Sequence, residues 1–138
     1  METSDTGRHF ITYFNLVQED VFQVATEKGW WQLPPWLKEV EQYVPEDLYL
    51  RIHAAVQPNK GEKVALMHSE LSEGLEGIRK DLQSDKIEGF SMIEEELADT
   101  IIRIMDYSQK FKLRVAEALM SKLEYNRHRP YMHGGKKF

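Results

Sequence analysis

Two stretches decide the fold: residues 62–82, EKVALMHSELSEGLEGIRKDL, and residues 91–111, SMIEEELADTIIRIMDYSQKF. Both repeat apolar residues at spacings of three to five, which is typical of amphipathic helices. Ser91, followed three residues later by Glu94, predicts a capping box at the start of the second helix. Only about eight residues join the two helices, so we expect them to form an antiparallel hairpin.

Each of these helices carries one pair of acids spaced three residues apart. Glu70 and Glu73 form the first pair, and Glu96 and Asp99 form the second. Residues three apart share a helix face, so each pair directs two carboxylates the same way. Four facing carboxylates repel one another, and a hard cation such as Mg²⁺ or Mn²⁺ relieves that repulsion because it prefers oxygen ligands. The alternative is a solvated acidic face without a ligand.

The acids flank apolar stripes, so we expect them at the rim of the helix–helix contact. The stripe residues are Leu66, Leu71, Leu75, Ile78 and Leu82 in the first helix and Leu97, Ile101, Ile104 and Met105 in the second. Asp106 follows Asp99 by two turns and is either a further site acid or a simple exposed one. Arg103 lies one turn before Asp106, where it would neutralise an acid or hold a phosphate oxygen.

The rest of the chain reads as helices, which predicts a single all-α domain over residues 1–138. We expect helices at 8–28 and 114–127, and one or two short helices between 36 and 56, broken at Pro45. Strand signals are nearly absent. The content of 41% hydrophobic and 30% charged residues indicates a globular chain, long enough to bury a sizeable core.

Composition also excludes several functions. A formal net charge of −5 argues against a protein that coats nucleic acid. The absence of cysteine excludes disulfides, thiolate zinc sites and cysteine nucleophiles, and it suits a reducing cytosol. No stretch approaches the roughly 18 apolar residues of a membrane span, and the N-terminus lacks the apolar region of a secretory signal.

Two further segments suggest contacts with a nucleotide. Lys122 and Asn126 share a helix face, and a basic tail follows at 128–138. This segment is either a phosphate clamp, with Asn126 and an aromatic ring reaching the nucleotide, or a solvated tail that frays. Trp30 and Trp31 follow Gly29; we expect one of them to fill the core, which leaves the other for stacking on a base.

At this point the motifs resemble a known family. The segments LVQEDVFQVATEKGWW, MHSELSEGLEGIR, EEELADTIIRIMDY and KLEYNRHRPYMHGGKKF are similar to successive parts of the MazG-like all-α nucleoside triphosphate pyrophosphohydrolases. The similarity is greatest with short, single-domain members from phages and bacteria. It covers most of the chain from about residue 13, except for residues 33–58, which look like an insertion or a lid.

The resemblance implies that the chain hydrolyses a (d)NTP between the α and β phosphates, giving a (d)NMP and pyrophosphate. It implies two or three Mg²⁺ ions, with Mn²⁺ possible, held by Glu70, Glu73, Glu96 and Asp99. Glu70 or Glu73 would instead take the proton from the attacking water. The expected substrate contacts, by resemblance or from the chemistry of the side chains, are Trp30, Arg103, Lys122, Tyr125, Asn126 and Arg129.

The resemblance further implies a homodimer or a dimer of dimers, in the cytosol of a bacterium or of a phage-infected host, and guanine nucleotides as the first substrates to test. Two close alternatives are a dUTPase- or dCTPase-like enzyme and a phosphoribosyl-ATP pyrophosphohydrolase. A more distant alternative is a non-enzymatic helical module whose basic tail docks a partner or nucleic acid. Pyrophosphate release that EDTA abolishes separates the enzymes from the module.

Overall fold

The computed structural model describes residues 4–130, and this part of the chain is all-α, as predicted. Its regular elements are helices, supplemented by one isolated bridge between Gln83 and Ser91. The helices are α1 (Asp5–Glu27), α2 (Trp36–Glu41), α3 (Glu46–Ala55), α4 (Lys60–Lys80), α5 (Met92–Lys110) and α6 (Val115–Arg127).

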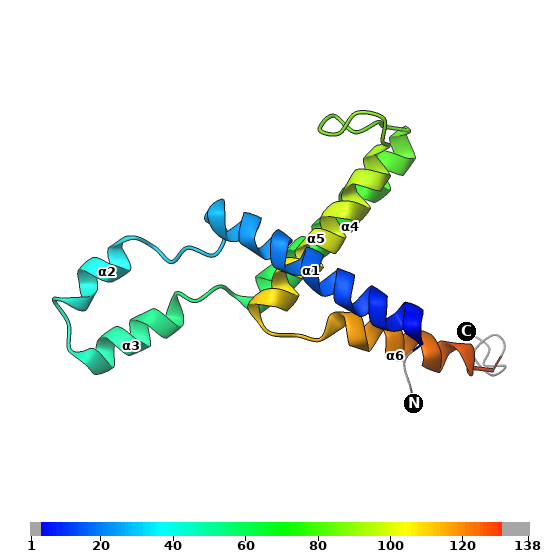
Figure 1. Cartoon of the computed structure of the whole chain (residues 1–138). Helices are drawn as coiled ribbons and strands as arrows, with labels where there is room; N and C mark the ends of the chain where they lie inside the picture. The colour runs from blue at the N-terminus through cyan, green and yellow to red at the C-terminus, as the bar shows by residue number, and fades with distance from the viewer. Residues whose placement is uncertain (1–3, 131–138) are drawn as a thin grey trace.

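The α4–α5 hairpin is the centre of the arrangement (Figure 1). The two helices run antiparallel, as predicted, and pack against each other more extensively than any other pair. Helix α1 crosses the hairpin and packs on α5, and α6 packs on α1. Helices α2 and α3 form a separate arm that projects away from the rest (Figure 1).

Local signals explain where the central helices begin and end. Asn59 caps α4, because its Oδ1 accepts hydrogen bonds from the backbone N–H groups of Gly61 and Glu62, at 2.8 Å and 3.2 Å. Helix α4 ends where Asp81 adopts the left-handed conformation, with φ of 51°. The predicted capping box between Ser91 and Glu94 forms at the start of α5.

Two glycines set the contact between α4 and α5. A Cβ built on Gly74 would lie 2.8 Å from Cδ1 of Ile93, and one on Gly77 would lie 2.9 Å from Cβ of Met92. A side chain at Gly77 would require a backbone shift and one at Gly74 would displace the end of the Ile93 side chain, so α5 approaches α4 along the glycine face of α4. That face also carries Glu70, which is buried together with the two glycines.

The apolar stripes lie mostly outside this contact, contrary to expectation. The most exposed of these side chains, between 46% and 60% accessible, are Leu71, Leu75, Ile78, Leu97 and Ile101. The reason is geometric: the glycine face allows the two backbones to approach, so it turns inward and the leucines turn outward. The hairpin therefore presents an apolar outer surface, which we call the outer stripe, made of these five residues.

The buried apolar side chains of the described residues are few: Ala25, Trp31, Leu37, Met105 and Ala116. The sizeable core expected from chain length is thus not formed by large aliphatic side chains within one chain. Trp31 is the tryptophan that fills the core, with the rings of Phe22 and Phe111 centred 6.3 Å and 6.0 Å away. It ties α1 to the end of α5.

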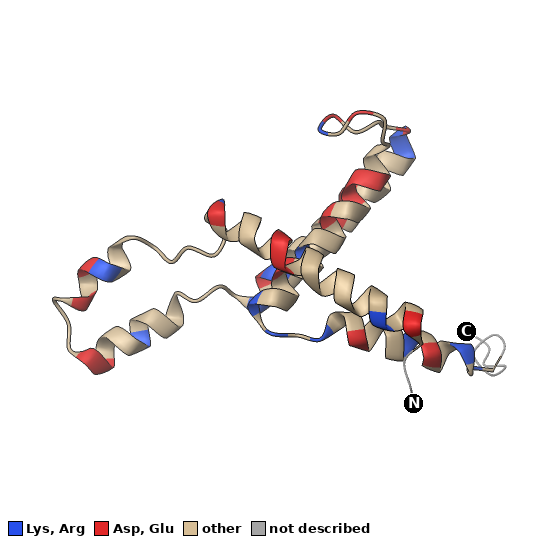
Figure 2. Ribbon diagram, in the orientation of Figure 1, with Lys and Arg blue, Asp and Glu red and all other residues tan. Residues whose placement is uncertain are grey.

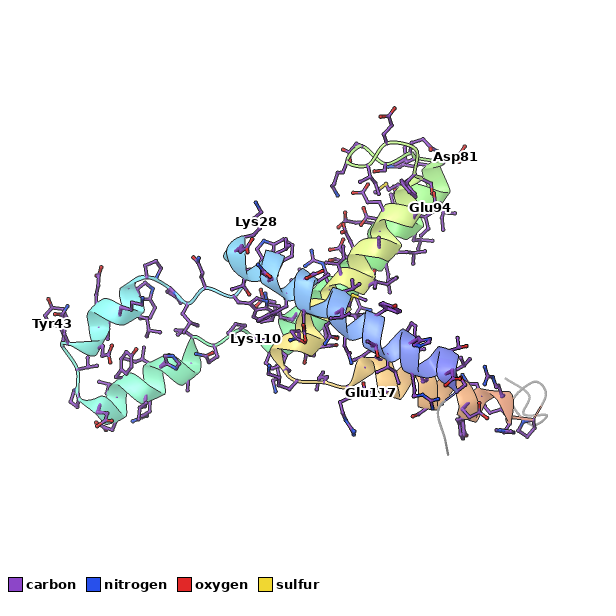
Figure 3. All side chains as sticks on the ribbon, viewed as in Figure 1. Lys28, Tyr43, Asp81, Glu94, Lys110 and Glu117 are labelled. Carbon is purple, nitrogen blue, oxygen red and sulfur yellow. The ribbon has the colours of Figure 1, made fainter. Side chains whose placement is uncertain are left out.

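The arm agrees with the expected pair of short helices, since Pro45 separates them and occupies the N-cap position of α3. Tyr43 lies at the tip of the arm, far from the hairpin (Figure 3). In residues 4–130, no helix combines the length and the apolar character that crossing a membrane requires.

Candidate metal centre

The facing sides of α4 and α5 bring three of the four predicted acids together. One carboxylate oxygen each from Glu70, Glu96 and Asp99 lies within 4.8 Å of the others. Asp and Glu recur along this hairpin (Figure 2). Glu73 is exposed and stands outside this triad, but it lines a cavity of about 440 Å³ together with Glu96. Three of the four predicted acids therefore lie close together, and Glu73 lies at the edge of this group.

Glu96 is the most constrained of these acids. Its side chain is 2% exposed, and its Oε2 has no hydrogen-bond partner among the described residues. Burial, together with the hydrogen bond with Glu70 and the negative charge of Glu73, raises the pKa of Glu96 to about 7. A buried carboxylate oxygen without a partner is costly, so this oxygen is available for a cation.

Arg103 neutralises one acid of the triad, one of the two roles expected for it. Its Nε–H donates to Oε1 of Glu70 at 2.5 Å, and both side chains are largely shielded from solvent. The guanidinium carbon also lies 5.8 Å from the centre of the Trp30 ring. Arg103 thus links the acidic triad to Trp30, which is 53% exposed.

Asp106 is neither a member of the triad nor an exposed acid, the two roles considered for it. It is buried, and its Oδ1 accepts a hydrogen bond from Nε1–H of Trp31 at 2.7 Å. The pKa of Asp106 is raised above its ordinary value, because the effect of burial exceeds the opposing effect of the Trp31 hydrogen bond. The ammonium groups of Lys63 and Lys110 lie 4.6 Å and 5.1 Å from the Trp31 ring. Asp106 therefore positions the core tryptophan at the junction of α1 and α5.

The predicted substrate contacts of α6 are not beside the triad in one chain. Helix α6 packs against α1 and lies on the opposite side of α1 from the α4–α5 loop (Figure 1), whereas Asp and Glu recur along the hairpin on the loop side (Figure 2). Its Lys122 ammonium lies 4.4 Å from the Tyr125 ring, and Tyr125 and Arg129 line a shallow cavity of about 340 Å³. Asn126 is exposed on the same helix. The part of the predicted tail from 131 to 138 lies outside the described residues.

Sequence reasoning missed a second polar cluster next to the triad. Glu95 is buried, and it pairs with Lys86 of the α4–α5 loop and with Ser84. The available signal was the run of three glutamates at 94–96. Consecutive helical residues point about 100° apart, so three acids in a row cannot share one role. In the structure Glu94 caps the helix, Glu95 holds the loop and Glu96 faces the triad.

The donor set fits a hard divalent cation. All three converging groups are carboxylates, no histidine takes part in the triad, and one buried oxygen has no hydrogen-bond partner in the described part of the chain. Glu70, Glu96 and Asp99 are the residues that would hold the ion, with Glu73 within reach of the same cavity. Comparisons of the chain with protein-family models, curated proteins and solved structures gave no match.

Without metal, the free energy of unfolding should fall as pH rises from about 5 to about 8. The folded protein keeps the Glu96 proton up to a pKa of about 7, whereas the unfolded chain loses it near the ordinary value of 4.5, so folding is favoured at the lower pH. Urea unfolding in EDTA measures this slope. Glu96→Gln should make it shallower, and Glu76→Gln, which alters an exposed α4 pair with Lys80, should not. Equal slopes in all three proteins would contradict the assignment.

Proposed function

We propose that this chain is a metal-dependent nucleoside triphosphate pyrophosphohydrolase, which cleaves a (d)NTP to a (d)NMP and pyrophosphate. The observation that carries the proposal is the convergence of Glu70, Glu96 and Asp99 on one spot, with a buried oxygen of Glu96 that has no hydrogen-bond partner within residues 4–130. Acids that merely solubilise a helix have no reason to be buried and to face one another. The resemblance of the four motif segments to MazG-like enzymes points to the same reaction.

The proposed division of labour follows from exposure and position. Glu70, Glu96 and Asp99 hold Mg²⁺ or Mn²⁺, two or three ions in the full site. Such ions supply charge neutralisation for the triphosphate and lower the pKa of a water. Glu73 is the exposed acid at the edge of the cavity, so it has room to accept the proton of the attacking water. Glu70 is the second candidate for this proton transfer, but its Oε1 is engaged by Arg103.

The nucleoside would lie on the α1 side of the triad. Trp30 offers an exposed ring face, and it lines an apolar cavity of about 300 Å³ between α1 and α5. Arg103, between this ring and Glu70, is placed to hold a phosphate oxygen near the scissile bond. Stacking on a ring does not discriminate strongly between bases, so guanine nucleotides are the first to test because of the resemblance alone.

The complete site requires a second copy of the chain, in a homodimer or a dimer of dimers. The outer stripe exposes five large apolar side chains along one face of the hairpin, which a monomer in water leaves unburied at a cost. A two-fold pair would cover the same stripe on both copies. We propose that Lys122, Tyr125, Asn126 and Arg129 contribute to the partner's site in this assembly, because the resemblance implies a site near a subunit contact. We place the enzyme in the cytosol of a bacterium or of a phage-infected cell.

Turnover tests the proposal directly. Incubation with each (d)NTP and Mg²⁺ should release pyrophosphate and the matching monophosphate, and EDTA should stop the reaction. Glu96→Gln and Glu73→Gln should lower kcat by roughly a thousandfold or more while helix content stays intact, because each removes a carboxylate from the site. Glu76→Gln, on the same helix as Glu73 but paired with Lys80, should retain full activity. No pyrophosphate from any nucleotide would favour the interaction module, and a preference for dUTP, dCTP or phosphoribosyl-ATP would favour the related enzymes.

The outer stripe should set the assembly state. Sedimentation equilibrium should give the mass of two or four chains for the native protein. Leu75→Glu should yield single chains, because it places a charge in the middle of the outer stripe, which the assembly would bury. The same change at Leu50, an equally exposed leucine of α3 (58% for each), should leave the mass unaltered. Sedimentation of the native protein as a single chain would contradict the proposal that two chains share the site.

A further inference from the structure

The loop between α4 and α5 carries a lysine that pairs with a buried carboxylate beside the triad. Nζ of Lys86 lies 2.5 Å from Oε1 of Glu95, a buried residue. The other oxygen of Glu95 accepts a hydrogen bond from the hydroxyl of Ser84, also at 2.5 Å. Glu95 directly precedes Glu96 in α5, so this pair is tied to the backbone that positions the triad.

The loop itself is held in place by backbone and hydroxyl contacts. The Ser84 hydroxyl accepts from the N–H groups of Lys86 and Ile87, at 3.2 Å and 2.9 Å. The N–H of Ser84 donates to the carbonyl of Phe90 at 2.9 Å, beside the bridge from Gln83 to Ser91. Ser84 therefore contacts the turn that carries Lys86, the returning segment of the loop at Phe90, and the buried Glu95.

Lys86 shares a cavity with the acids of the site. The cavity of about 440 Å³ is lined by Lys86 and Glu95 and also by Glu73 and Glu96. The side chain of Lys86 is 63% exposed, whereas that of Glu95 is 6% exposed. The ammonium group thus pairs with the buried Glu95 carboxylate, while its remaining N–H donors stay accessible from the cavity. The Glu95 hydrogen bond raises the pKa of Lys86, so the group stays cationic.

The order of groups along α5 gives the site a direction. Lys86 reaches α5 at Glu95, in the first turn; Glu96 and Asp99 follow, and Arg103 with Trp30 lies one turn beyond Asp99. A nucleotide that stacks on Trp30 and crosses the triad therefore extends its terminal phosphates toward the loop. The loop end is also where Asp81 marks the end of α4, far from the α1 crossing (Figure 3).

We propose that Lys86 is a phosphate-binding residue that holds the β and γ phosphates of the substrate, the part that leaves as pyrophosphate. This inference rests on the proposed function for the identity of the substrate. A structural ion pair would need no cavity and no accessible donors, whereas a phosphate anchor needs both. In the absence of nucleotide, Lys86 places one positive charge near Glu96 and Asp99 and so partly offsets the acidic cluster.

Calorimetry with two probes, inorganic pyrophosphate plus Mg²⁺ and dGMP plus Mg²⁺, tests this role without requiring turnover. Lys86→Gln should weaken pyrophosphate binding by about ten- to a hundredfold, the usual effect of losing a charged hydrogen bond, and should change dGMP binding by less than about twofold, because the monophosphate lies at the other end. Lys86→Arg should restore most of the loss. Lys80→Gln, an exposed lysine of α4 paired with Glu76, is the matched control and should bind both probes normally.

Metal binding gives a second readout that moves the other way. Titration with Mn²⁺ alone should show equal or tighter binding to Lys86→Gln, since a cation that repels the metal is gone. Weakening of pyrophosphate, dGMP and Mn²⁺ together would mean that Lys86 only supports the fold, and unchanged pyrophosphate binding would mean that it does not touch phosphate; either overturns the inference. Lysine-dependent pyrophosphate binding in a protein that hydrolyses no nucleotide would instead overturn the proposed function and leave Lys86 as a phosphate anchor.

Discussion

The close approach of α4 and α5 at Gly74 and Gly77 is the constraint on which the rest of the structure depends. A side chain at Gly77 would collide with Cβ of Met92 in the opposite helix, and one at Gly74 would displace the end of the Ile93 side chain. Because the glycine face turns inward, Glu70 comes within reach of Glu96 and Asp99. The same rotation places Leu71, Leu75 and Ile78 on the outside of the hairpin. The glycine contact between α4 and α5 thus produces both the acidic triad and the exposed outer stripe, the surface proposed to bind a second copy of the chain.

The charges around the triad are only partly balanced within the chain. Arg103 pairs with Glu70 on the α1 side, and Lys86 pairs with Glu95 on the loop side. Between them, Glu96 is buried, one of its oxygens has no hydrogen-bond partner among residues 4–130, and its pKa is raised to about 7. Fold stability alone does not favour such a residue, because an apolar side chain would pack there without the electrostatic cost. A binding site for a hard cation does favour such a residue, since the ion supplies the missing partner.

Much of the fold and part of the site could be predicted from sequence. Periodicity and capping signals located the α4–α5 hairpin and the capping box at Ser91, because these depend on residues close together in the chain. The three-residue spacing of the acids likewise predicted a shared direction, and Glu96 and Asp99 do converge, whereas Glu70 is buried in the triad and Glu73 is exposed at its edge.

The remaining features depend on contacts between distant segments, which local spacing does not encode. The apolar stripes were expected between the helices, but the glycines proved to decide which face turns inward. Asp106 looked like a further site acid or a surface acid, and only the packing of α1 reveals its partner Trp31. The Lys86–Glu95 pair joins a loop to a helix nine residues later, and no helical period marks it. The position of α6 relative to the triad likewise follows from its packing on α1.

The central claim is that α4 and α5 jointly hold a divalent cation, and anomalous diffraction from crystals grown with Mn²⁺ measures it most directly. The account predicts an anomalous peak bonded at roughly 2.1 Å to oxygens of Glu96 and at least one of Glu70 and Asp99. An ordered chain with no such peak in this place, or with Mn²⁺ bound only elsewhere while the three carboxylates keep their metal-free arrangement, would contradict it.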